Sequence, residues 1–349
     1  MVSLSKKVKR DQLVILITVE KKLKDKWEKK MRRAEKKRMG TGRKVFLWIL
    51  SILLIIIAGI AVYAGKIYFD VKSTADKTYE TVDRITESKR DKKIDYDAGD
   101  PFSILLLGVD TGDFGRTDQG RSDSIMVATV NPQKKTTTLV SIPRDTYTEI
   151  VGHGTSDKIN HAYAFGGMAM SIATVENMLD IPIDHYAEIN MKGMQDLVDA
   201  VGGVDVNNKL TFSYDGTDFP IGKQTLNGAD AVKYARMRYD DPKGDYGRQD
   251  RQRQVISGII NKVKSVDTLT NYTNLLEALG NNATTDVSWD TIKVLATNYR
   301  DAFSTIHSEQ LAGDSFTGDG TTGENGISYQ RASSEELARI QKELKEQLK

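Results

Sequence analysis

Arginines are concentrated in one stretch of this 349-residue chain, between positions 236 and 253. They are Arg236, Arg238, Arg248, Arg251 and Arg253. Apolar residues then recur at the spacing of one helix face, at Val255, Ile256, Ile259, Ile260 and Val263. Helical periodicity places Arg248 and Gln252 on that apolar side and directs Arg253 away from it. A buried guanidinium at a helix start suits a phosphate, because its planar donors match phosphate oxygens and the helix dipole adds positive charge.

Charged residues also follow or precede three predicted strands. Asp110 ends the first, Arg121 and Asp123 enter the second, and Arg144 and Asp145 follow the third. Ligands of open α/β sheets gather at strand ends. Asp110 and Asp123 could hold a hard cation such as Mg²⁺, which prefers carboxylate and phosphate oxygens. Each motif alone would more often be a local ion pair or a turn, but their occurrence together with the arginine stretch favours a phosphate site.

Several other chemistries find little support. The chain has no cysteine, which excludes disulfides, thiolate nucleophiles and cysteine-ligated metals. Its four histidines show no metal-binding spacing, and no phosphate-binding P-loop, GxSxG elbow or GxGxxG fingerprint is present. His161 could act as a base, although a lone histidine beside an apolar helix is more often structural.

The N-terminal part is divided into a basic tail and an apolar segment. Residues 1–44 carry 17 Lys and Arg against 5 Asp and Glu, a net charge of +12, and the rest of the chain carries −10. The tail could attract nucleic acid or anionic lipid, but a solvated cytoplasmic tail is the simpler interpretation. Residues 45–65 include 20 uncharged positions, enough to cross a bilayer as a helix. The basic excess before them predicts a cytoplasmic N-terminus and an extracellular C-terminal domain. A cleaved signal peptide is the less favoured alternative.

The remaining chain reads as a polar stalk (66–97), an α/β domain (98–334) and a charged, peripheral C-terminal helix (335–349). Strands are predicted at 102–109, 124–130, 137–142 and 304–311, and a loop at 314–328. Helices are predicted at 168–179, 191–201, 228–235, 249–264, 270–280 and 288–300. This mixture predicts an α-β-α sandwich with a mixed central sheet, preceded by a single N-terminal transmembrane helix.

Six motifs, in order, carry a resemblance to a known family. They are LLLGVD (105–110), GRSDS (120–124), SIPRDT (141–146), KINHAYAFGG (158–167), ARMRYD (235–240) and DYGRQDRQRQ (245–254). Together with the single N-terminal anchor, they resemble the extracytoplasmic domain of the LytR–CpsA–Psr family. The resemblance covers about two thirds of the chain, residues 98–334.

This resemblance implies a membrane-anchored phosphotransferase of Gram-positive cell envelopes. Such an enzyme moves a glycopolymer (teichoic acid, capsule or another wall polysaccharide) from a polyprenyl-pyrophosphate carrier to peptidoglycan. The positions matching the family's pyrophosphate-binding residues are Arg121, Arg144, Arg236, Arg238, Arg248 and Gln252. Asp110 and Asp123 match its metal positions, for Mg²⁺ or Mn²⁺. Asp245 is a candidate general base or arginine-orienting group, and Asp145 is a second candidate base.

The residue types agree with that chemistry. Phosphoryl transfer needs positioning and charge stabilisation, which arginines and Mg²⁺ supply without a covalent nucleophile, and a carboxylate would assist the accepting sugar hydroxyl. Helices 168–179 and 255–263 could line an apolar slot for the lipid, or be ordinary core. Two rival functions are a membrane-tethered transcriptional attenuator, which would need residues 1–44, and a non-catalytic wall-polymer binding module. No specific nucleic-acid partner is expected.

Overall fold

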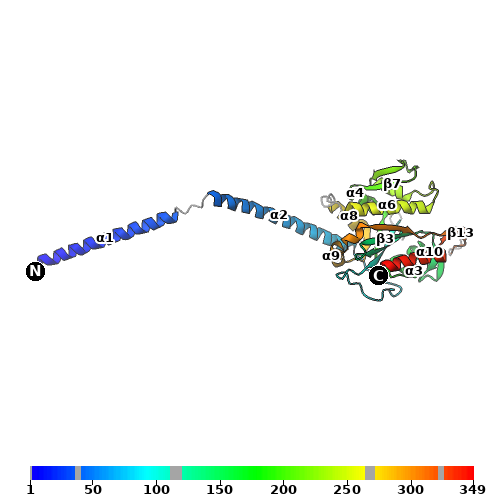
Figure 1. Cartoon of the computed structure of the whole chain (residues 1–349), viewed down its shortest axis with the longest axis horizontal. Helices are drawn as coiled ribbons and strands as arrows, with labels where there is room; N and C mark the ends of the chain where they lie inside the picture. The colour runs from blue at the N-terminus through cyan, green and yellow to red at the C-terminus, as the bar shows by residue number, and fades with distance from the viewer. Residues whose placement is uncertain (1, 36–40, 111–119, 264–271, 321–325) are drawn as a thin grey trace. The chain divides into compact units, whose positions relative to one another are not determined.

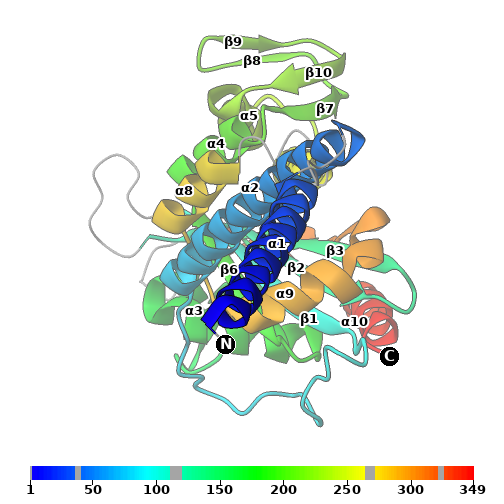
Figure 2. The ribbon, with the colours of Figure 1, turned by 90° about the vertical axis from the view of Figure 1, so that its left-hand side faces the viewer.

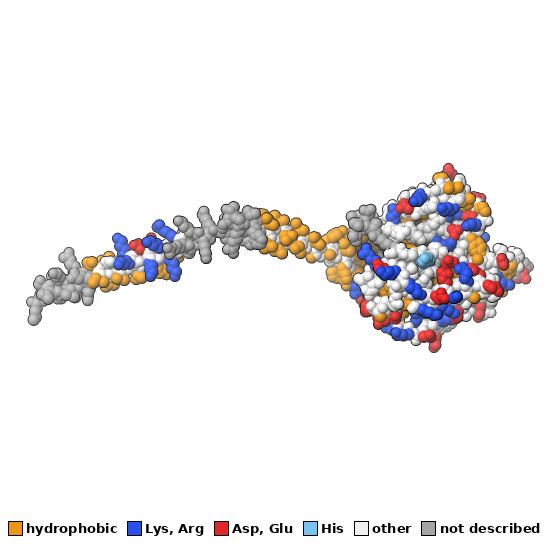
Figure 3. Space-filling model, viewed as in Figure 1, with side chains coloured by type: hydrophobic (Ala, Val, Ile, Leu, Met, Phe, Trp, Pro, Cys, Tyr) orange, Lys and Arg blue, Asp and Glu red, His pale blue; other side chains and the backbone are white. Residues whose placement is uncertain are grey.

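The computed structural model describes residues 2–35, 41–110, 120–263, 272–320 and 326–349. Contacts divide the chain into two compact units, Met1–Ile67 and Tyr68–Lys349. The first unit contains α1 (Val2–Glu35) and most of α2 (Thr41–Thr78). Of the described helices, one is long and apolar enough to cross a membrane, from Trp48 to Thr78. Figure 3 shows apolar side chains covering the described part of this helix.

The second unit is built on a mixed sheet, which confirms the predicted fold class. In the described residues the sheet has the strand order β11-β6-β1-β2-β3-β12. Its central strands are β1 (Phe102–Val109), β2 (Ser122–Asn131), β3 (Thr136–Ile142) and β6 (His185–Asn190), with β11 (Ala283–Thr285) and β12 (Ile306–Gln310) at the edges. β1 runs antiparallel to β2 and parallel to β6. The apolar run in β1 forms the predicted strand, but only one face, with Leu105, Leu107 and Val109, is fully buried, while Ile104 and Leu106 on the other face are half-buried.

Helices cover both faces of this sheet (Figure 1). α3 (His161–Leu179) and α10 (Ser334–Gln347) lie on one face, where their apolar residues join a core with Leu105, Val127 and Val140. α4 (Met191–Ala200), α5 (Gly228–Arg236) and α6 (Asp245–Val263) lie toward the other face. There Ile256 of α6 packs against Met126, Ala128 and Leu139. The expected layers, helix on sheet on helix, are therefore present.

A smaller group of strands extends the α4–α6 side. It consists of β7 (Val204–Asn208) paired with β10 (Gly222–Leu226), and β8 (Phe212–Tyr214) paired with β9 (Thr217–Phe219). Phe212 and Phe219 stack on each other beside Tyr234 of α5, in a core of their own. Figure 2 shows these strands beside α4 and α5, away from α3 and α10. α8 (Tyr272–Asn282), α9 (Trp289–Asn298) and the 3₁₀ turn η2 (Arg300–Ser304) complete the edge near β11 and β12.

Several local expectations were wrong. The C-terminal helix is not peripheral, because Ile340 and Leu344 are fully buried in the core under α3. The expected loop at 314–328 contains β13 (Asp314–Gly318), which pairs with β14 (Ile327–Arg331) in a hairpin. A second hairpin, β4 (Tyr147–Ile150) with β5 (Thr155–Lys158), was missed because its strands are short and polar. Helix α3 starts earlier than expected, at His161, and is broken at Gly166 and Gly167.

Most of the segment expected to be a stalk, residues 68–97, belongs to the second unit and makes specific contacts within it. Arg84 Nη1 lies 3.1 Å from Glu176 Oε1, and Arg90 Nε donates to Asp184 Oδ1 at 2.8 Å. Burial, partly offset by the Arg84 ion pair and the Ile183 amide, raises the pKa of Glu176. The second unit begins at Tyr68. The ion pairs of Arg84 and Arg90 with buried carboxylates fix this N-terminal segment to the rest of the unit.

Candidate functional site

The ends of the first three sheet strands bring two predicted site residues together. The β1–β2 ladder pairs Gly108 with Ser124 and Val109 with Ser122, so Asp123 lies at an irregularity in the ladder. Arg144, two residues beyond the end of β3, places Nη1 2.5 Å from Asp123 Oδ1. Burial acts to lower the pKa of Arg144, but the charge and hydrogen bond of Asp123, together with the charges of Asp145 and Asp245, outweigh it, and the pKa is raised. This arginine is therefore held charged at the strand ends.

Arg248 reaches the same place from the first turn of α6. Its side chain is 7% exposed, and Nη2 lies 2.6 Å from Asp245 Oδ1. The same nitrogen donates to the backbone oxygen of Asp123 at 3.4 Å. Burial lowers the pKa of Arg248, and the charge of Arg144 acts in the same direction against the opposing charge of Asp245. Two arginines from distant parts of the sequence thus lie against one aspartate, as their expected convergence requires.

Asp245 holds Arg248 in position. The aspartate side chain is 3% exposed, and its second oxygen accepts from Gln249 Nε2 at 2.7 Å. Gln249 Oε1 in turn accepts from Gln310 of β12 at 2.8 Å. This chain of contacts fixes the carboxylate from both sides, so it is placed to orient Arg248.

The Asp241 side chain lies close to the backbone of Gly247, which explains why a glycine precedes Arg248. A Cβ on Gly247 would lie 1.9 Å from Asp241 Oδ2, so a larger residue would collide with that carboxylate. Asp241 is held there by Arg251, whose Nη1 lies 2.6 Å from Asp241 Oδ2. Arg251 also donates Nε to the Tyr234 carbonyl at 3.0 Å. Arg251 is therefore part of the structure that presents Arg248.

Some polar atoms of the site have no hydrogen-bond partner among the described residues. They include Arg144 Nε, Arg248 Nε and Gln252 Oε1, all buried, and Asp245 Oδ1, which forms an ion pair with Arg248. Buried donors and acceptors are normally satisfied, because leaving them unpaired costs free energy. Their grouping beside Asp123 indicates a ligand that both accepts and donates hydrogen bonds.

An apolar cavity of about 300 Å³ opens beside these groups. Its lining comes from β1, β2 and β6 on one side and from α4, α5 and α6 on the other, and includes Leu106, Met126, Met194, Leu197, Val232, Val255, Ile256, Ile259 and Ile260. Asp123, Arg236, Arg248 and Gln252 also line it. As the periodicity of α6 predicts, Arg248 and Gln252 lie on the side of its apolar residues. Arg253 lies on another side of the helix and does not line this cavity. A charged region meets an apolar cavity here.

Helix 168–179 does not line this cavity. In the described structure Met168, Ile172, Val175, Met178 and Leu179 belong to the core on the opposite face of the sheet. The ordinary-core alternative is therefore the observed one for this helix, while 255–263 does line the cavity.

The remaining predicted residues lie around this centre less closely. Arg121 is exposed, and its backbone nitrogen donates to Asp110 Oδ1 at 2.6 Å. Arg238 Nε lies 4.0 Å from Asp245 Oδ1. Asp145 pairs with Lys158 Nζ at 2.7 Å and lies 3.9 Å from Arg144 Nε. Residues 111–119, between Asp110 and Arg121 in the sequence, fall outside the described residues.

Sequence reasoning missed Lys158, Asn190 and Glu188. Asn190 and Glu188 line the cavity from β6, a strand that was not predicted. Burial raises the pKa of Glu188, although its hydrogen bond from Tyr163 at 2.8 Å opposes the shift. His161 Nδ1 lies 2.8 Å from buried Asp157, which also accepts from Tyr329, so its structural interpretation is the better supported one.

The carboxylates at the strand ends fit a metal site that a bound phosphate helps to complete. In the described part of the chain no group of three or more His, Asp or Glu side chains could hold an ion. Asp110 and Asp123 offer carboxylate oxygens at adjoining strand ends. Mg²⁺ is commonly held by one or two carboxylates together with substrate phosphates, so this donor set fits an ion that a phosphate ligand helps to bind.

Comparison with known proteins gives the family. A model of the LytR_cpsA_psr family matches residues 66–346. The chain belongs to the LytR–CpsA–Psr family. It is 52% identical over 310 residues to the polyisoprenyl-teichoic acid–peptidoglycan teichoic acid transferase TagU of Enterococcus faecalis, covering 89% of this chain and 99% of that protein. The resemblance to this family that was drawn from the sequence is thus confirmed.

Solved structures of the family share this fold. The structure of TagT bound to LIIa-WTA is 33% identical, with a TM-score of 0.64, and the match covers 77% of this chain and 99% of that one. The structure of a protein described as a transcriptional regulator from Enterococcus faecalis is 45% identical, with a TM-score of 0.64, covering 73% and 90%. Relatives of this chain are therefore described both as a teichoic acid transferase and as a transcriptional regulator.

Proposed function

We propose that this chain transfers a glycopolymer from a polyprenyl-pyrophosphate carrier to peptidoglycan, as the name of its TagU relative describes for that protein. The observation that supports this most strongly is the junction of charge and apolar surface. Arg144 and Arg248 converge beside Asp123 at the mouth of a cavity lined by apolar side chains. A lipid pyrophosphate has the same two parts, an anionic head and an apolar tail.

In this proposal the arginines bind and orient the pyrophosphate. Arg144 and Arg248 each have a buried Nε without a hydrogen-bond partner in the described residues, available to phosphate oxygens. Arg236 and Gln252 line the cavity beside them, and Arg238 and Arg121 lie further out. Buried arginines stabilise developing charge better than exposed ones, because less water screens them.

Asp123 and Asp110 would hold a Mg²⁺ or Mn²⁺ ion together with the pyrophosphate. The ion supplies neutralisation of phosphate charge when bound. Asp123 is paired with Arg144 in the structure. Arg144 would therefore exchange part of its contact with Asp123 for a contact with the phosphate when the substrate enters.

The acceptor is a peptidoglycan sugar hydroxyl. Its oxygen forms a bond to the phosphorus that carries the glycopolymer, the bond from that phosphorus to the bridging oxygen breaks, and polyprenyl phosphate leaves. A carboxylate takes the hydroxyl proton. Asp245 is enclosed by Arg248 and Gln249, which suits a positioning role. Asp145, which pairs with Lys158 and lies 3.9 Å from Arg144 Nε, is the other candidate base.

The apolar helix supports a location in the membrane. We propose that α2 is a single-pass anchor, with residues 1–44 in the cytoplasm and the domain outside the cell. The strong basic excess before the apolar segment favours that orientation. The proposed substrates, a lipid-linked glycan and peptidoglycan, are met on that outer side.

The test uses the full-length chain in detergent with a labelled polyprenyl-pyrophosphate-linked oligosaccharide, peptidoglycan and Mg²⁺. The wild type should form a covalent conjugate, and Arg248→Ala or Arg144→Ala should abolish it. Arg300→Ala, which changes an exposed arginine outside the site, is the matched control and should retain activity. Conjugation undiminished in an Arg144→Ala, Arg248→Ala double variant would refute the proposal.

A regulatory role is the second candidate, because a related structure is described as a transcriptional regulator. It would have to use the N-terminal tail. The described part of this tail, Val2–Glu35, is one continuous helix without a helix-turn-helix. Deleting residues 2–35 should leave transfer unchanged, whereas a regulator would lose its function. A non-catalytic polymer-binding module would form no conjugate and would tolerate both removal of Mg²⁺ and Asp123→Ala.

A further inference from the structure

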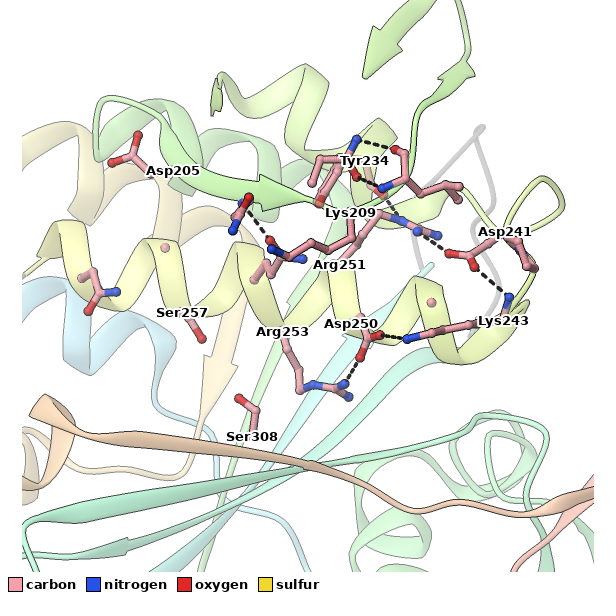
Figure 4. Close-up of a pocket in the computed structure, with 18 residues that line it drawn as sticks. Asp205, Lys209, Tyr234, Asp241, Lys243, Asp250, Arg251, Arg253, Ser257 and Ser308 are labelled. Atoms are coloured by element: carbon pink, nitrogen blue, oxygen red, sulfur yellow. Dashed lines mark hydrogen bonds and ion pairs between the residues drawn. The ribbon is translucent and has the colours of Figure 1, made fainter. Parts of the chain in front are cut away.

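Helix α6 has a second face that the proposed reaction does not use. Its residues recur at helical spacing on the side away from Ile256, and they are Gly247, Asp250, Arg251, Gln254, Ser257, Gly258 and Asn261. They line a groove of about 750 Å³ (Figure 4). Ligand sites commonly have volumes of about 300 to 1,000 Å³, so this groove is large enough to hold a small chain of sugars.

The other walls of the groove combine polar residues with the apolar surfaces of Leu210, Tyr234 and Pro242. They come from β7 and the residues after it, from the turn before α6, and from Ser308 of β12. Asn207 and Asn261 are exposed, Ser257 is half-buried, and Gln254 Oε1 accepts from the Asn207 amide at 2.9 Å. Amides and hydroxyls on several elements thus offer both donors and acceptors along the groove.

Carboxylates and cations in the groove are mostly paired with each other. Asp241 pairs with Arg251 at 2.6 Å, and Asp250 pairs with Arg253 and lies 3.6 Å from Lys243 Nζ. A polyanion would have to approach these carboxylates, as well as Asp205, without a strong excess of unpaired cations. The charge pattern therefore favours a neutral ligand over a polyphosphate chain.

Arg253 supplies an independent indication of a ligand. Its side chain is only 10% exposed, and Nη1 has no hydrogen-bond partner among the described residues. Figure 4 shows Arg253 extending from α6 on the side of Ser308. A buried guanidinium nitrogen without an acceptor is costly, so an acceptor group entering the groove would stabilise it.

We propose that this groove binds a neutral, amide-bearing oligosaccharide, such as the N-acetylated glycan strand of peptidoglycan. Sugar hydroxyls and acetamide groups both donate and accept, which matches Asn207, Ser257 and Asn261, and an acetamide carbonyl suits Arg253 Nη1. Arg248 lines the apolar cavity and not this groove, so the groove anchors the strand and takes no part in the reaction. The identification with peptidoglycan rests on the proposed function, while the sugar class rests on the groove itself.

The test is isothermal titration of the full-length chain in detergent with a tetramer of N-acetylglucosamine, without donor or metal. The wild type should bind, and Ser257→Trp, which fills the groove, should weaken binding at least tenfold. Ala296→Trp, at an exposed position on α9, is the matched control and should bind as the wild type does. Because Ser257→Trp could disturb folding, Asn261→Ala is a second variant, with Asn177→Ala as its exposed-amide control. It should weaken binding by about threefold or more, the loss of one net hydrogen bond.

Two results would overturn this proposal. One is a wild type that does not bind the tetramer, or binds it equally well after Ser257→Trp and Asn261→Ala. The other is preferential binding of poly(glycerol phosphate), the backbone type of an anionic wall polymer. Turnover of the lipid-linked donor, measured separately on the same variants, distinguishes these results from failure of the proposed transferase function, because the groove residues do not contact the reacting head group.

Discussion

Arg248→Met separates the structural role of this arginine from its proposed role in transfer. The substitution keeps a long apolar stem beside the cavity and removes the guanidinium. It leaves the Asp245 carboxylate, 3% exposed, without the partner at 2.6 Å. Breaking a buried pair by removing one partner typically costs about 3 to 5 kcal/mol. Gln249 still donates to Asp245 at 2.7 Å, and Arg238 lies at 4.0 Å, so the lower end applies.

A loss of about 3 kcal/mol should lower the melting temperature by about 6 to 12 °C for a domain of this size. Removing both charges in the double variant Arg248→Met, Asp245→Asn should recover most of that loss, since replacing both partners of a buried pair is often nearly neutral. Transfer should fall at least about 100-fold in the single and the double variant alike, because the phosphate loses a buried donor in each.

The assays are thermal unfolding in detergent and conjugation of labelled donor to peptidoglycan. If the double variant recovers both its melting temperature and its transfer rate, Arg248 acts only through folding, and its assignment as a phosphate ligand is refuted. A single variant with an unchanged melting temperature would instead contradict the reasoning on the buried pair.

Three further predictions follow from other parts of the molecule. Leu344→Ala in α10 should lower the free energy of unfolding by about 2 to 5 kcal/mol, measured by chemical unfolding, because Leu344 is fully buried. Lys342→Ala, at an exposed position of the same helix, should change the free energy of unfolding little. Equal effects of the two substitutions would contradict the buried position of α10. Chelation by EDTA should abolish conjugation. Mg²⁺ or Mn²⁺ should restore conjugation in the wild type, and Asp123→Ala should need a higher metal concentration. Full activity in EDTA would exclude a role for the metal in transfer. Hydrogen bonds from Lys345 and Lys89 lower the pKa of Asp180 to about 2, so this carboxylate stabilises the fold above its unfolded pKa near 4 and loses that effect as the pH falls toward 2. Between pH 6 and pH 2 the Asp180→Asn variant should lose less folding stability than the wild type. Because Asp180 is about half exposed, the difference should be less than about 1 kcal/mol. The same pH dependence in both proteins would show that these contacts do not form.

Strong periodicity made parts of the fold predictable. A buried strand was predicted from the continuous apolar run of β1, and a helix from the spacing of Val255, Ile256 and Ile259. The structure has both elements. The same spacing placed Arg248 and Gln252 on the cavity side of α6. Where burial imposes a regular pattern on the sequence, the positions of polar residues relative to that pattern can be predicted as well.

Elements with a weak pattern were missed or misjudged. β6 alternates only briefly between polar and apolar residues, so Glu188 and Asn190 were not placed at the cavity. In α10 the buried Ile340 and Leu344 are four residues apart, but the surrounding charges concealed this narrow apolar stripe. The apolar face of α3 was real, yet its periodicity could not indicate which side of the sheet it covers. That choice depends on tertiary packing, which local sequence does not encode.

Photocrosslinking with a polyprenyl pyrophosphate that carries a photoreactive group in its lipid chain tests the central claim most directly. After irradiation of the full-length protein in detergent, mass spectrometry should find the label on cavity-lining residues of α4, α5 and α6, such as Met194, Val232, Ile256 and Ile260. Excess unlabelled polyprenyl pyrophosphate should displace it, and Arg144→Ala, Arg248→Ala should weaken it. Labelling of α3 or α10, on the other face of the sheet, would contradict the proposed lipid site. Equal labelling of the wild type and of the Arg144→Ala, Arg248→Ala variant would contradict it as well.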